Sequence, residues 1–138
     1  MHITLIDPPR YTFPLNHASN VAIPPLGIAY IASSIEKNGH SVHVIDSVGS
    51  ALINYTKFGA VYLRGLEFAD IIKKIDPDTD IITIGNMFSC QWPVTKHLIN
   101  LIKDTFPQKP IVLGGEHPTG MPKLSFKQSS VDILVLGE

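Results

Sequence analysis

The residues best suited to ligand chemistry stand in two loops, each directly after a short apolar run. The first loop contains Gly85, Asn86, Met87, Phe88, Ser89 and Gln91, and the second contains Gly114, Gly115, Glu116 and His117. Amide and hydroxyl side chains pair with neutral polar ligands, and glycine lets a ligand approach the backbone closely. Because both loops hold few charges, we expect them to contact a broad organic cofactor and no small ion.

Each of these residues also has a structural interpretation. Gly114 and Gly115 are expected either to contact a ligand or to form an ordinary turn after a buried strand. Met87 and Phe88 provide an apolar floor for a ligand or belong to the core. The polar residues hydrogen-bond a ligand or cap a helix, and His117 donates to a ligand or faces solvent. Cys90 has no basic neighbour in sequence that would lower its pKa, so we interpret it as a bystander.

Other chemistries are poorly supported by the sequence. Asp7 and Asp46 stand at the ends of predicted strands and suggest a Mg²⁺ site for phosphoryl transfer, as in response regulators. Such a site also needs an aspartate ending the third strand and a lysine ending the fifth. The chain has Gly85-Asn86 and Gly137-Glu138 there. A phosphate-binding glycine loop is also absent after the first strand, where Pro8-Pro9-Arg10 stands.

Length and composition fit one domain that covers residues 1–138 and buries a substantial core. Hydrophobic residues make up 44% of the chain, as expected for strands covered on both faces. The formal net charge of -1 and the scattered basic residues argue against nucleic acid as a partner. The apolar runs are too short to cross a bilayer. A single cysteine fits a reducing compartment, and we expect a cytoplasmic location.

Hydrophobic periodicity predicts strands alternating with helices. We expect strands at 2–6, 41–46, 80–84, 111–113 and 132–136, and helices at 25–37, 66–75, 93–105 and about 121–128. Residues 8–24 read as a long irregular loop, and residues 47–64 read as mostly loop with one short ordered piece. This alternation predicts an α/β fold with a doubly wound parallel sheet in the order 2-1-3-4-5. That order places residues 7–25 beside residues 85–91 at the switch point of the sheet.

Several motifs occur in an order and spacing that resemble a known family. The matching pieces are Leu5-Ile6-Asp7-Pro8-Pro9, Pro24-Pro25-Leu26-Gly27-Ile28-Ala29-Tyr30, Lys37-Asn38-Gly39-His40, Met87-Phe88-Ser89, Val112-Leu113-Gly114-Gly115-Glu116-His117-Pro118-Thr119 and the closing Asp132-Ile133-Leu134-Val135-Leu136-Gly137-Glu138. Over nearly its whole length the chain resembles the N-terminal cobalamin-binding domain of the B12-dependent radical SAM enzymes. Together these motifs form a moderately specific signal, although each alone is weak.

The resemblance implies a flavodoxin-like, three-layer domain that holds a corrin over the carboxyl ends of its strands. Pro25, Leu26 and Gly27, together with the two loops, are then the expected cofactor contacts. The resemblance also implies a radical SAM domain, with S-adenosylmethionine and a [4Fe-4S] cluster, in a parent methyltransferase. Cys90 alone cannot build that cluster's three-cysteine motif, so this chain does not bind the cluster. We expect a truncated chain without catalytic residues of its own.

The chain differs from other cobalamin domains in the segment that supplies the cobalt ligand. Methionine synthase and the mutases carry D-x-H-x-x-G after the first strand, and its histidine ligates cobalt. This chain has Asp7-Pro8-Pro9-Arg10-Tyr11-Thr12 instead. We therefore expect base-off cobalamin without a protein histidine on cobalt.

Two expectations concern partners. The surface left open by the missing domain favours a homodimer. The alternative to the whole interpretation is a cofactor-free α/β regulatory or interaction domain.

Overall fold

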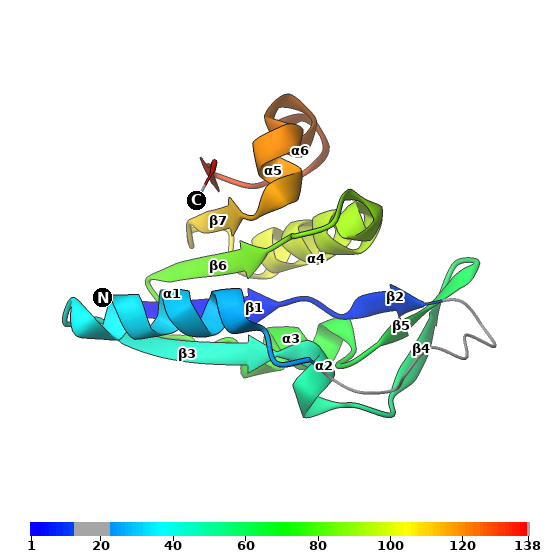
Figure 1. Ribbon diagram of the computed structural model, residues 1–138, viewed down its shortest axis with the longest axis horizontal. Coiled ribbons are helices and arrows are strands. Elements are labelled where there is room, and N and C mark those ends of the chain that lie inside the picture. The colour runs from blue at the N-terminus through cyan, green and yellow to red at the C-terminus, as the bar shows by residue number, and fades with distance from the viewer. Residues whose placement is uncertain (13–22, 138) are drawn as a thin grey trace.

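The computed structural model describes residues 1–12 and 23–137, and its elements alternate along the chain (Figure 1). They are β1 (His2–Asp7), β2 (Arg10–Thr12), α1 (Leu26–Lys37), β3 (Ser41–Asp46), α2 (Ser47–Ser50), β4 (Tyr55–Phe58), β5 (Val61–Arg64), α3 (Phe68–Lys74), β6 (Ile81–Gly85), the 3-10 turn η1 (Ser89–Gln91), α4 (Trp92–Thr105), β7 (Ile111–Gly114), α5 (Glu116–Gly120), α6 (Pro122–Gln128) and β8 (Ile133–Val135). Within the described residues, no helix is long and apolar enough to cross a membrane.

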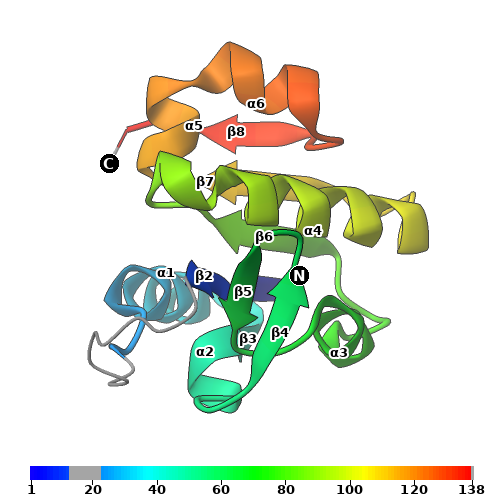
Figure 2. The same ribbon diagram turned by 90° about the vertical axis from the view of Figure 1, so that its right-hand side faces the viewer.

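Five parallel strands form the main sheet in the order β3-β1-β6-β7-β8. Counted along the chain within this sheet, the order is 2-1-3-4-5, as predicted. Figure 2 shows α1 on one face of the sheet and α3 and α4 on the other, which confirms the three-layer α/β class. All predicted strands and helices of this sheet are present, with boundaries shifted by a few residues.

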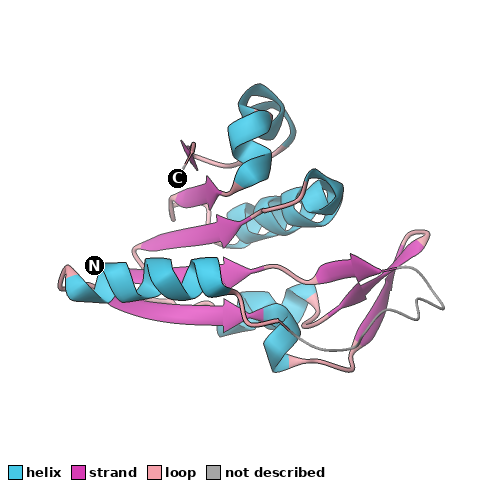
Figure 3. Ribbon diagram, viewed as in Figure 1, coloured by secondary structure: helices cyan, strands magenta, loops and turns pink. Residues whose placement is uncertain are grey.

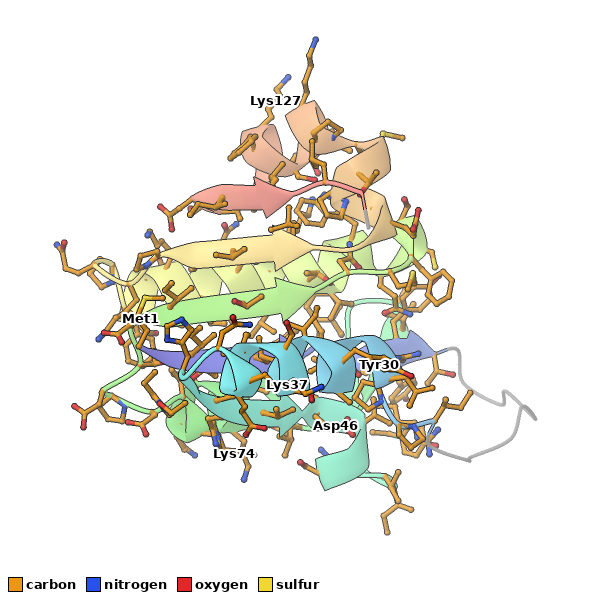
Figure 4. All side chains as sticks on the ribbon, turned by 60° about the vertical axis from the view of Figure 1, so that its left-hand side comes forward. Met1, Tyr30, Lys37, Asp46, Lys74 and Lys127 are labelled. Atoms are coloured by element: carbon orange, nitrogen blue, oxygen red, sulfur yellow. The ribbon has the colours of Figure 1, made fainter. Side chains whose placement is uncertain are left out.

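The core lies almost entirely between the sheet and the helices α3 and α4. The strands contribute fully buried isoleucines and leucines to it, and α4 contributes Leu98, Ile99 and Ile102. In contrast, α1 has no buried residue, and Leu26, Tyr30 and Ile31 are exposed. On β8, Ile133 and Val135 are 49% and 52% exposed. Figure 4 shows α1 lying over the β1 side of the sheet, with no helix in front of β6, β7 and β8. The α1 face of the sheet is therefore only partly covered.

A second sheet was not predicted. Strands β2, β5 and β4 form an antiparallel sheet that extends beyond the carboxyl ends of the main strands (Figure 3). The prediction of a mostly irregular segment at 47–64 is therefore wrong, because that segment contains α2, β4 and β5. The prediction of an irregular loop at 8–24 is wrong for β2, and its residues 13–22 lie outside the described part. The short helix α5 was also not predicted.

Candidate functional site

The two predicted loops meet at the carboxyl ends of β6 and β7. The backbone N–H of Asn86 donates to the carbonyl of Gly114 at 2.8 Å, and the N–H of His117 donates to the carbonyl of Asn86 at 3.2 Å. Between them, Gly115 has φ +116°, and a Cβ there would lie 2.5 Å from the Asn86 carbonyl oxygen. Only glycine combines this dihedral with this approach. The close junction of the loops therefore requires Gly115.

His117 lies inside this junction. Its side chain is 2% exposed and stacks on Trp92 with ring centroids 4.5 Å apart. Nδ1 pairs with the hydroxyl of Ser89 at 2.9 Å, while Nε2 is buried without a hydrogen-bond partner in the described part of the chain. Burial lowers the pKa of the imidazole below its ordinary value of 6.5, so the ring is neutral at pH 7. The solvent-facing alternative for His117 is wrong, and its contact with a cofactor stays a prediction.

Asn86 adds a second unsatisfied group to the same junction. The residue is 3% exposed, and its Oδ1 accepts a hydrogen bond from the Thr95 hydroxyl at 3.3 Å. Its Nδ2 is buried and has no partner among the described residues. An unpaired buried polar atom costs about 1–3 kcal/mol. The junction thus contains two polar atoms, on Asn86 and His117, whose hydrogen-bonding capacity the described residues leave unused.

The buried imidazole predicts a pH-dependent stability. The ring of His117 has a pKa near 6.5 in the unfolded chain and a lower pKa in the folded protein. Below about pH 6.5 the unfolded state therefore binds more protons than the folded state. The free energy of unfolding that the neutral ring contributes is therefore lost as the pH falls. We expect wild type to lose more unfolding free energy than His117→Phe between pH 7.5 and 5.5, measured by urea denaturation. An equal loss in both proteins would contradict this account, because the phenylalanine variant retains the other titrating groups.

The remaining polar residues of the first loop connect elements of the fold. Gln91 Oε1 accepts a hydrogen bond from the backbone N–H of Tyr11 at 3.0 Å, which ties β2 to η1. This contact confirms that residues near position 11 lie beside the loop at 85–91. Cys90 is exposed, and a hydrogen bond with its thiol raises the pKa of the Tyr11 phenol. Gln91 thus has a structural role that the sequence did not indicate.

The apolar loop residues are not part of the core. Met87 and Phe88 are 58% and 56% exposed, so the interpretation of these two side chains as core residues is wrong. Glu116 is also exposed, at the first position of α5. Exposed aromatic and thioether side chains at a strand-end loop are available to cover a large apolar ligand. Their contact with a cofactor remains a prediction.

A pair of glycines leaves space on the α1 face of the sheet. Gly85 and Gly114 are paired in register, and Gly114 is paired with Val135. A Cβ on Gly85 would meet only the Ile28 side chain, at 3.6 Å, and a Cβ on Gly114 would meet only Val135 Cβ, at 3.9 Å. We call these two residues the glycine shelf. It lies between α1 and β8, on the face of the sheet that α1 covers only in part.

The third group of predicted contacts borders the shelf from α1. Pro25 precedes the helix as its N-cap, and Leu26 and Gly27 form its exposed first turn. Leu26 is 64% exposed, and a Cβ on Gly27 would meet nothing within 4 Å. Ile28 in the next position contacts the shelf. The start of α1 therefore lies near the shelf and is accessible, while direct cofactor contact by Pro25, Leu26 and Gly27 stays a prediction.

The two strand-end carboxylates are occupied by local interactions. Asp46 Oδ1 accepts a hydrogen bond from the Gly49 N–H at 2.8 Å and caps α2. Asp7 lies 3.5 Å from the guanidinium of Arg10. Burial raises the pKa of Asp7, and the neighbouring Arg10 opposes that shift. This arrangement gives no support to a magnesium site at Asp7 and Asp46.

Comparisons with known proteins agree with this geometry. The architecture is that of a flavodoxin-like α/β domain whose accessible glycines lie at the strand ends. The model of the B12 binding domain family matches residues 15–138, and the chain belongs to that family. It is therefore a cobalamin-binding domain.

Two curated relatives are methyltransferases. The chain is 31% identical over 118 residues to the cytidylyl-2-hydroxyethylphosphonate methyltransferase of Streptomyces wedmorensis, an alignment that covers 83% of this chain and 22% of the relative. It is 32% identical over 141 residues to an uncharacterized methyltransferase of Pyrococcus horikoshii, covering 100% of this chain and 27% of the relative. The chain thus spans about a quarter of the length of these relatives.

Proposed function

We propose that this chain is the cobalamin-binding module of a B12-dependent radical SAM methyltransferase and that it holds base-off cobalamin without a protein histidine on cobalt. The observation that carries the proposal is the glycine shelf. Gly85 and Gly114 keep the ends of β6 and β7 free of side chains on a face that α1 covers only in part. A bulky cofactor needs such an uncovered surface beside the loops that bind it.

The residues around the shelf fit the chemistry of cobalamin. The corrin is a broad macrocycle with neutral amide side arms, and neutral amides pair with neutral polar groups. Asn86 and Ser89 are such groups, and the exposed side chains of Met87 and Phe88 supply apolar surface. Ile28 and Val135 border the shelf with apolar side chains. When bound, cobalamin supplies a cobalt centre through which a methyl group is transferred. The chain's own contribution is to bind and orient the cofactor.

The absence of a histidine ligand is supported by the sequence and by the position of His117. No histidine occurs in the segment Asp7-Pro8-Pro9-Arg10-Tyr11-Thr12, where the ligand of other cobalamin domains stands. His117 has its Nδ1 paired with Ser89 and its ring stacked on Trp92. Its other nitrogen, Nε2, is buried, so it reaches a metal only if the junction opens. We therefore assign no metal ligand to the protein.

The partner of this module is a radical SAM domain on a longer parent chain. The relatives' much greater length supports this proposal. S-adenosylmethionine and the [4Fe-4S] cluster belong to that second domain, and the substrate also contacts that domain. In this arrangement the chain alone binds cofactor without turnover, in the cytoplasm as the single cysteine suggests.

A second candidate is a cofactor-free interaction domain. The exposed apolar side chains of α1 and β8 favour it, because large apolar patches mark interaction surfaces. The same face would also support the predicted homodimer. A homodimer formed through this face would dissociate on dilution and on Val135→Lys substitution, whereas the cobalamin module binds its cofactor as a monomer.

Titration of the purified chain with hydroxocobalamin and methylcobalamin tests the proposal. We expect a saturable change of the visible spectrum to the base-off form with one site per chain. Folding is checked in the same samples by circular dichroism. A folded chain that leaves both spectra unchanged would favour the interaction domain. Saturable binding that keeps the base-on spectrum would contradict the base-off assignment alone.

A further inference from the structure

Asp7 stands in the same row of the main sheet as the glycine shelf. On the neighbouring strands β1 and β6, Ile6 is paired with Ile84. The next residue of β1, Asp7, therefore lies beside Gly85, which is in turn paired with Gly114. Side chains of residues in register on neighbouring strands project from the same face of a sheet. Asp7 thus borders the shelf from the β1 side.

The burial of the preceding residues shows from which face Asp7 projects. Ile6 and Ile84 belong to the core that the sheet forms with α3 and α4. Successive side chains of a strand point to opposite faces, so Asp7 projects from the α1 face. A Cβ on Gly85 would likewise meet Ile28 of α1. A carboxylate therefore stands at the border of the surface that the proposed function assigns to the cofactor.

The carboxyl group of Asp7 has little contact with solvent and a long ion pair. Its side chain is 15% exposed, and its Oδ2 lies 3.5 Å from a guanidinium nitrogen of Arg10. Burial raises the pKa of Asp7, because the loss of solvent disfavours the charged form and Arg10 only partly offsets this effect. A carboxylate offers about four lone-pair positions, and the contact with Arg10 uses only part of this capacity. Further hydrogen-bond donors at the shelf would therefore stabilise the carboxylate.

The geometry points to Asp7 as a cofactor-binding residue that selects corrinoids whose side arms are amides. This inference rests on the proposed function and names a residue that determines the specificity of the same site. The primary amides at the rim of a corrin carry N–H donors, which a carboxylate accepts. The propionamide arms are the longest of these amides, so they reach a bordering side chain most readily. A propionate in the same place would bring two negative charges together where little water screens them.

Titration of the purified chain with hydroxocobalamin and with its b-, d- and e-monocarboxylic acids tests this selection. In each acid one propionamide arm is replaced by a propionate, and the rest of the corrin is unchanged. Dissociation constants come from the visible spectrum at neutral pH. We expect wild type to bind at least one of the acids about tenfold more weakly than hydroxocobalamin. Equal affinity for hydroxocobalamin and all three acids would overturn the inference.

Three variants assign the selection to the charge of Asp7. Asp7→Asn keeps the size of the side chain and should bring the affinities for hydroxocobalamin and the disfavoured acid to within about twofold of each other. Arg10→Gln removes the ion-pair partner and should discriminate as wild type does. Asp70→Asn removes a carboxylate on α3, on the opposite face of the sheet, and should also discriminate as wild type does. Circular dichroism checks that each variant is folded.

The possible results separate this inference from the proposed function. Undiminished discrimination in Asp7→Asn, or an equal loss of discrimination in Arg10→Gln, would overturn the role of Asp7 while hydroxocobalamin binding upholds the cobalamin module. If the folded wild-type chain binds none of the four corrinoids, the proposed function is wrong, and the role of Asp7 is wrong with it.

Discussion

Gly115→Ala is expected to lower the free energy of unfolding by about 2–4 kcal/mol, a loss from backbone strain and steric overlap together. The added Cβ would lie 2.5 Å from the Asn86 carbonyl oxygen, at a backbone φ of +116° that alanine avoids. The neighbouring atoms are backbone, so they cannot move aside as a side chain would. The steric overlap is relieved only if the loops after β6 and β7 separate. Urea denaturation followed by circular dichroism measures this loss.

The matched control for Gly115→Ala is Gly120→Ala in the adjoining helix. A Cβ on Gly120 meets nothing within 4 Å, and its backbone φ is not in the left-handed region. This substitution should therefore change stability by less than about 0.5 kcal/mol. If the two variants unfold at the same urea concentration, the contact between the loops is not the constraint described here.

Gly114→Val is expected to leave the fold intact and to weaken cobalamin binding at least tenfold, which corresponds to about 1.4 kcal/mol or more. Valine is favourable in a β-strand, and a Cβ at this position meets only Val135, at 3.9 Å. Its methyl groups would occupy the space above the shelf. The binding constant comes from visible-spectrum titration with hydroxocobalamin.

A size series gives this experiment its internal control. Gly114→Ala should fall between wild type and Gly114→Val in affinity, while urea denaturation shows similar stability for all three proteins. Wild-type affinity in Gly114→Val would exclude the shelf as the cofactor site. A loss of stability parallel to the loss of affinity would show that folding, and not occupation of the shelf, is responsible.

The main sheet could be predicted from the sequence because its signals are local. Runs such as Ile81-Ile82-Thr83-Ile84 are typical of a strand buried on both faces, and Asn38-Gly39 ends the first helix. Alternation of strands and helices then leaves few possible topologies, since crossovers are right-handed. The positions of the two candidate loops at one edge follow directly from that order.

The antiparallel sheet could not be predicted because its pairing is not local. The segment from Asn54 to Gly65 contains two glycines and scattered aromatic residues, and no alternation of long apolar side chains indicates a strand. The hairpin gains its third strand from β2, which lies far away in sequence. The hydrophobic contact of Phe58 and Phe68 with α4 stabilises the arrangement. Sequence periodicity contains none of this information.

The interior of the candidate site was missed for a related reason. Sequence reasoning placed His117 and Ser89 in separate loops and gave no reason to bring Trp92 close to the histidine. The structure joins all three through a ring stack of 4.5 Å and a hydrogen bond of 2.9 Å. A contact between residues 28 positions apart has no periodic signature.

The core lies mainly on one face of the sheet, and this determines where the domain opens locally at the lowest cost. Helices α3 and α4 pack against the fully buried side chains of the sheet, whereas α1 contributes no buried residue. Local opening costs least free energy where few apolar contacts are lost. We therefore expect the amides of α1 to exchange hydrogen with solvent before those of α3 and α4. Because Ile28 of α1 borders the shelf, such a local opening would widen the accessible surface beside Gly85.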